Sequence, residues 1–364
     1  MSDQLDRSPD RHAPRLEFAS DRPDLSPGHH EPGHPAGPDQ PELRSGPHES
    51  GGAAALDRLG VSLGHEPRRA GTDGQPDACA VVLIDGRLDL RETLAQVRVG
   101  PTDPCFRQLD GAVWRATRTP DGPATERLRR QPDGSVVVDA WGPGAAWLIA
   151  HAPALCGAHD DPSAFQPTQP AVRRLADRHP GLRIGRTAAV FEAAVGVTLE
   201  QRVATRDAWH SWRGLVRAFG EPAPGPLAGL WVPPSPGQVA HLPFHVFHRF
   251  GVEERRAAAV RRLAIVAQRL EDTVSLPLQQ AYARFLAIAG IGPWTAAHIG
   301  LVALGDADAV IVGDLHLPHL VSRVLAGEQR GSDARMLELL EPFRGHRGRV
   351  IRLLMANVVS GGRV

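Results

Sequence analysis

Between residues 80 and 141, short apolar runs are separated by turn residues, a pattern that is typical of β-strands. Four short segments in this region are rich in β-branched and apolar residues and are predicted to be strands: 80–84, 113–119, 125–130 and 135–141. Asp121-Gly122 and Asp133-Gly134 separate the last three segments, and such dipeptides favour hairpin turns. The pattern therefore predicts a small antiparallel sheet.

The apolar run that follows, residues 144–157, has the character of a helix and would cover one face of that sheet. We therefore expect a small α+β domain over residues 78–160. Pro162, Pro167 and Pro170 come next, and they predict a linker over residues 161–180.

From residue 181 to residue 364 the period is helical, so the fold class is mainly α with an N-terminal α+β domain. Thr187 is expected to cap the first of these helices and Gly220 to end the second. Ser332 is expected to cap a late helix, and Asn357 to lie near the end of the last one. No internal repeat is visible.

Charge is distributed unevenly, although the net charge is zero. Residues 1–77 contain 8 Arg and 14 Asp or Glu, whereas residues 181–364 contain 21 Arg and 15 Asp or Glu. The first region is also rich in Pro, Gly and His, so it is predicted to be a disordered acidic tail.

Three cysteines, Cys79, Cys105 and Cys156, form neither a CxxC pair nor an even disulfide framework, which favours a reducing cytoplasm. None lies beyond residue 156, so a four-cysteine iron–sulfur loop near the C-terminus is excluded. We expect no membrane span and no signal peptide.

The segment AGIGPWTA, residues 289–296, lies between two apolar helices, so a hairpin is predicted at 286–296. Pro293 suits the first position of the second helix and Gly305 suits its end. The tight turn leaves backbone N–H groups unpaired at the start of that helix, where they can hold a phosphate of DNA. An acidic residue, Asp314, stands 24 positions after Gly290.

This hairpin and the distant carboxylate resemble those of the helix-hairpin-helix DNA glycosylase superfamily, within it the 3-methyladenine DNA glycosylase II branch. Residues 181–205 and 249–264 are similar to helices that precede the hairpin in that branch, and residues 111–144 more faintly to its N-terminal sheet. The resemblance implies a two-lobed helical core over residues 181–364 that excises damaged bases, alkylated ones above all, after flipping them out of double-stranded DNA.

The resemblance assigns catalysis to Asp314, where a carboxylate would stabilise the positive charge that develops on the sugar. The other interpretation is that Asp314 caps the following helix, and the two roles can coexist. Trp294 and His298 lie four residues apart on one helical face and are assigned to the pocket for the base, with core packing as the alternative. Contacts with the DNA backbone are assigned to Gly290, Gly292 and Thr295.

The chain contains no lysine. Bifunctional relatives use a lysine in the hairpin helix as a Schiff-base nucleophile, and Trp294 occupies that place here. We therefore expect a monofunctional glycosylase that leaves an abasic site.

Two positions depart from the pattern of the branch. Gln201 is followed by Arg202 where a bulky apolar wedge is common, and both are assigned to filling the gap left by a flipped nucleotide. The last helix lacks a tryptophan that the branch often has. Nearby Arg347 and Arg349, in a run that also contains Arg344 and Arg352, are candidate phosphate contacts, with a solvated basic face as the alternative.

Two other classes of function remain open. A non-catalytic DNA-binding protein could use the same hairpin. A metal-dependent hydrolase could use His241, His245 and His248, or Asp314, His316 and His319, although Pro243 interrupts the first set. We expect no metal site and no cofactor, apart from a monovalent cation that could bridge hairpin carbonyls and phosphate. The expected protein is a monomer associated with the nucleoid, and its acidic tail could compete with DNA for the basic core.

Overall fold

The computed structural model describes residues 61–63 and 74–361, all within one compact unit, Ser50–Val364. Most of the predicted tail, residues 1–77, lies outside the described residues. The disorder predicted for this tail therefore stays a prediction. No helix among the described residues is long and apolar enough to cross a membrane.

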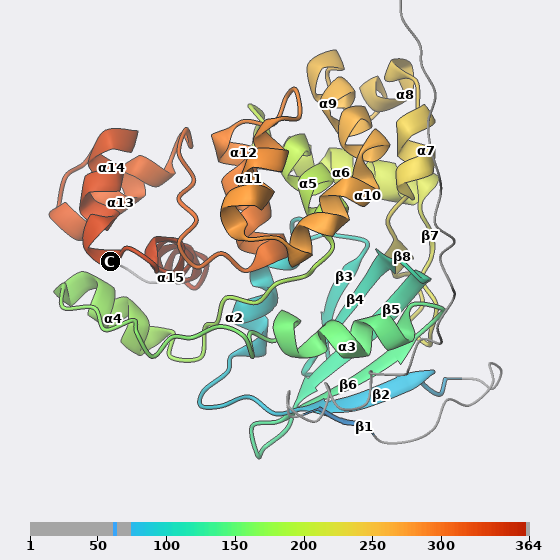
Figure 1. Cartoon of the computed structure of the whole chain (residues 1–364), viewed down its shortest axis with the longest axis horizontal. Coiled ribbons are helices and arrows are strands. Elements are labelled where there is room, and N and C mark those ends of the chain that lie inside the picture. The colour runs from blue at the N-terminus through green and yellow to red at the C-terminus, as the bar shows by residue number, and fades with distance from the viewer. Residues whose placement is uncertain (1–60, 64–73, 362–364) are drawn as a thin grey trace, which may run out of the picture. The chain divides into compact units, whose positions relative to one another are not determined.

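Six antiparallel strands form one sheet in the order β1-β2-β6-β5-β4-β3 (Figure 1). The strands are β1 (Val61–Leu63), β2 (Ala78–Val82), β3 (Phe106–Leu109), β4 (Ala112–Thr119), β5 (Gly122–Arg130) and β6 (Val136–Trp141). The four predicted strands are confirmed as β2, β4, β5 and β6. The two outer strands, β1 and β3, were missed because three or four residues show too little alternation, and β1 extends the sheet into the region predicted to be tail.

Helix α3 (Ala145–Leu155) lies across one face of the sheet (Figure 1). Its buried Leu148 and Ile149 share a core with Leu128 of β5 and Val138 of β6. Full burial of one such side chain contributes roughly 1.5–3 kcal/mol. Two short elements, α2 (Leu90–Leu94) and η2 (Ala95–Val97), connect β2 to β3.

From residue 170 to residue 361, the regular elements are helices except for a short β-ribbon, which confirms the predicted fold class. The elements before the hairpin are α4 (Pro170–Arg178), α5 (Val190–Leu199), α6 (Thr205–Phe219), β7 (Glu221–Pro222), β8 (Trp231–Val232), α7 (Pro236–His241), α8 (Phe244–His248), α9 (Glu254–Ile265), α10 (Ala267–Glu271), η3 (Asp272–Ser275) and α11 (Leu278–Leu286). Those after it are α12 (Pro293–Ile299), η4 (Gly300–Leu304), α13 (Leu317–Ala326), α14 (Asp333–Leu340), η5 (Glu341–Phe343) and α15 (Arg347–Val359).

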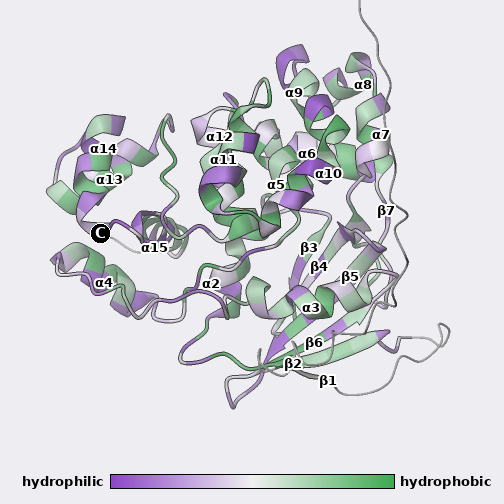
Figure 2. Cartoon of the chain, in the orientation of Figure 1, coloured by the Kyte–Doolittle hydropathy of each residue, from purple (hydrophilic) through white to green (hydrophobic). Residues whose placement is uncertain are grey.

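These helices surround two hydrophobic cores. One core is formed mainly by α5, α6 and α9–α12, and the other by α4 and α13–α15. Helix α12 belongs to both, because Ala296 and Ile299 pack in the first core and Ala297 in the second. Most of these helices carry both hydrophobic and hydrophilic residues (Figure 2), as expected for helices with one buried face. The helices around each core form one lobe, and the two lobes meet at α12.

The range predicted to be a linker, residues 161–180, differs from the structure because it contains α4. Pro170 stands in the first turn of this helix, where its missing N–H is no loss, and Gln169 accepts a hydrogen bond from the N–H of Val172. Val172 and Leu175 are buried in the second core. A proline that suggested a linker therefore marks the start of a packed helix.

Ser332 caps α14, Gly220 ends α6 and Gly305 ends η4, as predicted. The predicted cap at Thr187 is wrong, because α5 begins three residues later. The N–H groups of Val190 and Phe191 donate instead to the carboxylate of Glu271 on α10, both at 2.8 Å. Glu271, 80 residues beyond Phe191, thus caps the helix that the sequence predicted Thr187 to cap.

Candidate functional site

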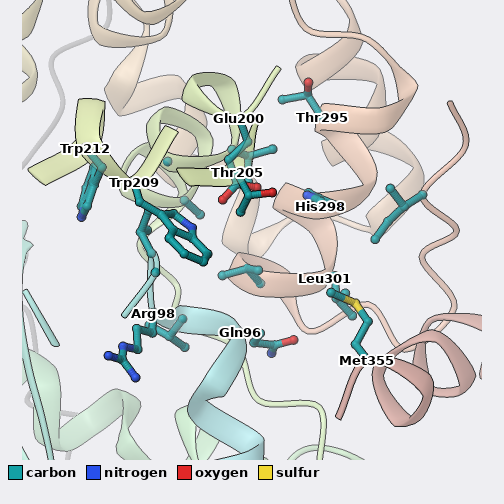
Figure 3. A pocket seen from close by; sticks show the side chains of 18 of the residues that line it. Gln96, Arg98, Glu200, Thr205, Trp209, Trp212, Thr295, His298, Leu301 and Met355 are labelled. Carbon is teal, nitrogen blue, oxygen red and sulfur yellow. The ribbon is translucent and has the colours of Figure 1, made fainter. Parts of the chain in front are cut away.

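A large cleft lies between the two helical lobes and the segment that follows α2 (Figure 3). Its volume is about 2310 Å³, above the roughly 300–1,000 Å³ of ordinary small-molecule sites. It is lined by the ends of α5 and α15, the start of α6, the hairpin, and the loop before α13. A cleft of this size has room for part of a macromolecule.

The hairpin turn depends on Gly290, whose φ is 100°. A Cβ at this position would stand 2.8 Å from the Cβ of Ala259 on α9, so both the conformation and the space require glycine. Gly292 then caps α12, and Pro293 occupies the first turn. Among the described residues no partner accepts from the N–H of Gly290 or Gly292, so both are available to an anion.

Gln201 braces this hairpin from the end of α5. Its Nε2 donates to the carbonyl of Gly290 at 3.0 Å and to Oγ1 of Thr295 at 2.8 Å. These two bonds use both N–H groups of the amide and hold the side chain against the hairpin, so this geometry does not suit the predicted role of Gln201 as a wedge. Thr295 is only 2% exposed and its hydroxyl accepts from Gln201, so its side chain has a structural role, and a contact with DNA through its backbone stays a prediction.

Arg262 occupies a hairpin carbonyl that a monovalent cation would need as a ligand. Its NH1 donates to the carbonyl of Ala289 at 2.9 Å, while the carbonyl of Gly290 accepts from Gln201. The guanidinium already places positive charge beside the oxygens that would bind a cation. These residues therefore do not fit a monovalent cation.

Asp314 lines the cleft and is half-buried. Its Oδ1 accepts from the backbone N–H groups of His316 and Leu317, both at 2.8 Å, which caps α13. Its Oδ2 accepts from Nε1 of Trp294 at 3.1 Å. Burial raises the pKa of Asp314, but these hydrogen bonds and nearby His298 outweigh it and hold the pKa below its usual value. The carboxylate is therefore fixed in place and ionised at neutral pH.

Trp294 and His298 both line the cleft, and their rings lie side by side with centroids 4.4 Å apart. Trp294 also packs against the second core, as the alternative interpretation expects, and its contact with a base stays a prediction. Removal from solvent lowers the pKa of His298 to about 4, although the charge of Asp314 acts in the opposite direction. His298 is therefore neutral at pH 7 and can donate or accept a hydrogen bond.

Arg202 follows Gln201 and has a φ of 55°, which is unusual for a residue other than glycine. Its side chain is exposed at the edge of the cleft. Strained backbone of this kind persists only where the surroundings impose it, and it concentrates at functional sites. Of the two wedge candidates, Arg202 is thus the one that the structure leaves accessible.

The predicted phosphate contact of Arg349 is wrong. Arg349 and Asp160 form a buried ion pair in which each side chain is 3% exposed. Arg347 donates to Asp308 through Nε at 2.9 Å and NH2 at 2.5 Å, and it lies outside the cleft. Of the run that suggested a basic surface, Arg349 and Arg352 are therefore buried inside the protein, because α15 packs with one face inward, and Arg347 pairs with Asp308.

The two histidine sets do not converge on a metal site. Within residues 61–63 and 74–361, no three His, Cys, Asp or Glu side chains are close enough together to hold a metal ion. His241 binds the carbonyl of Gly237, and Nδ1 of His319 accepts from the N–H of Gly331.

Several cleft residues were missed by the sequence analysis: Gln96, Arg98, Glu200, Thr205 and Trp209 (Figure 3). Glu200 was within reach of sequence reasoning, since it directly precedes Gln201. Trp209 was not, because only the fold brings α6 against the loop at Gly100, where an added Cβ would strike its ring at 2.4 Å. Trp209 thus adds an aromatic ring to the lining of the cleft.

No family model matches the chain. A curated relative, described as a probable bifunctional transcriptional activator/DNA repair enzyme AlkA from Mycobacterium tuberculosis, is 32% identical over 227 residues. The match covers 58% of this chain and 44% of the relative, so the chain spans less than half the length of that protein.

Among solved structures, a 3-methyladenine DNA-glycosylase from Archaeoglobus fulgidus superposes with a TM-score of 0.65 and 17% identity, over 76% of this chain and 98% of that one. An 8-oxoguanine glycosylase/lyase from Clostridium acetobutylicum, in complex with double-stranded DNA, gives 0.62 and 13%, over 78% and 96%. The fold is thus that of the helix-hairpin-helix glycosylases. Over the 227 matched residues, the sequence is similar to that of the AlkA relative.

Proposed function

We propose that the chain is a DNA glycosylase that removes damaged bases, alkylated ones among them, from double-stranded DNA by hydrolysis of the N-glycosidic bond. The observation that supports this most is the placement of Asp314. An ionised carboxylate, held by three hydrogen bonds, lines the same cleft as the unpaired N–H groups of the glycine hairpin.

Each part of the cleft then has a role. The N–H groups of Gly290 and Gly292 bind a phosphate of the damaged strand, and Arg202 fills the space that the flipped nucleotide leaves. Trp294 and His298 contact the base. The carboxylate of Asp314 stabilises the positive charge on the sugar as the base departs and orients the water that attacks the anomeric carbon.

An Asp314→Asn variant tests this proposal. The amide oxygen can still cap α13, so the fold should persist, whereas the charge is lost. We expect base release from oligonucleotides with a single 7-methylguanine, read after alkaline cleavage, to fall by about 10²–10³-fold. DNA affinity should change little. Asp207→Asn, at an exposed aspartate of α6 outside the cleft, is the matched control. Equal activity of the Asp314→Asn variant and the wild type would refute the carboxylate mechanism, and absence of base release by the wild type would favour a DNA-binding protein without activity.

We further propose that the enzyme has no lyase activity. The chain has no lysine, and strand cleavage by a side-chain amine requires one. Borohydride added to the same reactions should trap no covalent enzyme–DNA adduct. An adduct that forms in proportion to base release would contradict this.

A further inference from the structure

The cleft contains a second carboxyl group, Glu200, at the C-terminal end of α5. Glu200 belongs to the first helical lobe, whereas Asp314 precedes α13 in the second. In Figure 3 its side chain lies among those that line the cavity, in the region of Thr205 and His298. Because the cleft separates the lobes, a base held between them would have one acid on each side.

Glu200 differs from the other buried acids of the cleft in its hydrogen bonds. Asp103 accepts from the N–H groups of Val99 and Cys105 and from Nε1 of Trp212, and Glu192 accepts from the hydroxyl of Thr117. For the carboxyl group of Glu200, no hydrogen bond occurs within the part of the chain that the structure describes. It is half-buried, unengaged, and available to a molecule in the cleft.

The surroundings of Glu200 favour its neutral form. Burial and the negative charge of Asp314 raise the pKa of Glu200 to about 7. A position at the C-terminal end of a helix, where the helix dipole is negative, acts in the same direction.

The guanidinium of Arg256, which also lines the cleft, is directed away from Glu200. Arg256 of α9 donates to the carbonyls of Leu199 and Gly251 at 2.8 and 3.0 Å. Helices α6 and α10 and the η4 turn contribute no charged residue to the described lining of the cleft. The remaining charged or titratable groups of the lining on elements next to the end of α5 are Arg202, Glu253, Arg255 and His298.

We propose that Glu200 is a catalytic acid that donates its proton to the departing base, and that it thereby enables release of neutral purine lesions. This inference rests on the proposed glycosylase activity. Two nearby carboxyl groups whose environments differ in this way commonly divide the roles of acid and charge stabiliser, as in glycoside hydrolysis. Here Asp314 is the ionised stabiliser and Glu200 the proton donor.

The electrons of the bond between C1′ and the base nitrogen move onto the base, and a ring nitrogen of the base takes the proton of Glu200, so the base leaves as a neutral molecule. Water then forms a bond to C1′ and gives a proton to Asp314, which passes it to solvent. Glu200 regains a proton from solvent. A base that is already cationic, such as 7-methylguanine, leaves as a neutral molecule without this proton.

The distinction between neutral and cationic bases provides the test. Single-turnover release of hypoxanthine, a neutral base, and of 7-methylguanine is measured for the wild type, Glu200→Gln and Glu254→Gln between pH 5.5 and 8.5. Glutamine has the shape of glutamic acid but cannot give up an acidic proton. We expect Glu200→Gln to lower hypoxanthine release by about 100-fold and to change 7-methylguanine release by no more than about threefold. Glu254→Gln, at an exposed acid of α9 outside the cleft, should change neither.

The pH profile is the second measurement. Because the acid must be protonated, hypoxanthine release by the wild type should fall as pH rises through about 7, and the Glu200→Gln variant should lack this dependence. Retained 7-methylguanine release shows that the variant is folded. Equal loss on both bases, or no loss on either, overturns the role of Glu200 while the glycosylase proposal stands. A wild type that releases only the cationic base also overturns it, and a wild type that releases neither base removes both proposals.

Discussion

Replacement of Gln201 by leucine separates two roles for this residue, a wedge that acts on DNA and a brace that acts within the protein. The amide donates to Gly290 and to Thr295. A neutral hydrogen bond contributes about 0.5–1.5 kcal/mol net, so loss of both should cost about 1–3 kcal/mol. The value lies toward the upper end because the hydroxyl of Thr295, which is 2% exposed, would lose its partner away from water.

The assay is urea denaturation without DNA, with amide hydrogen exchange at residues 288–296 as a local measure. We expect Gln201→Leu to lower the free energy of unfolding by that amount and to speed exchange at the hairpin. Gln280→Leu is the matched control, because Gln280 is exposed on the neighbouring α11 and its side chain forms no hydrogen bond to any described residue. Unchanged stability and exchange, together with slower base release, would refute the brace and restore the wedge.

Two further substitutions test the site and a corrected contact. Trp294→Phe keeps an aromatic ring but removes the N–H that donates to Asp314. Base release should slow by about tenfold, equivalent to about 1.4 kcal/mol, with unchanged DNA affinity. An unaltered rate would exclude a role for that hydrogen bond. Arg349→Ala leaves Asp160 buried without its partner, so the free energy of unfolding should fall by about 3–5 kcal/mol. Arg344→Ala is the control, because it breaks an exposed pair with Glu341 and should lower the free energy of unfolding by less than about 1 kcal/mol. A stable Arg349→Ala variant whose DNA affinity depends less on salt would reinstate the phosphate contact.

Local chemistry made the hairpin predictable. Gly290, Gly292 and Pro293 each satisfy a requirement that is fixed within a few residues: a positive φ, a helix N-cap, and a first turn without a needed N–H. The strands β4, β5 and β6 were predictable for the same reason, because alternation and Asp-Gly turns are local signals.

Predictions failed where the outcome depended on a partner far along the chain. Thr187 looked like a helix cap, but Glu271 satisfies that helix end. Pro170 looked like part of a linker, but the second core buries the helix that it begins. Arg349 looked like a surface arginine until Asp160, 189 positions earlier, was found against it.

The sequence by itself determined the class of fold, the glycine hairpin and the acid that follows it, since backbone geometry and periodicity are set by neighbouring residues. Only the tertiary structure decided which side chains face the cleft and in what state of charge. It placed Glu200 within the field of Asp314 and turned Gln201 onto the hairpin. The physical reason is that burial and charge interactions depend on distance in space, and that distance is created when the two lobes pack around α12.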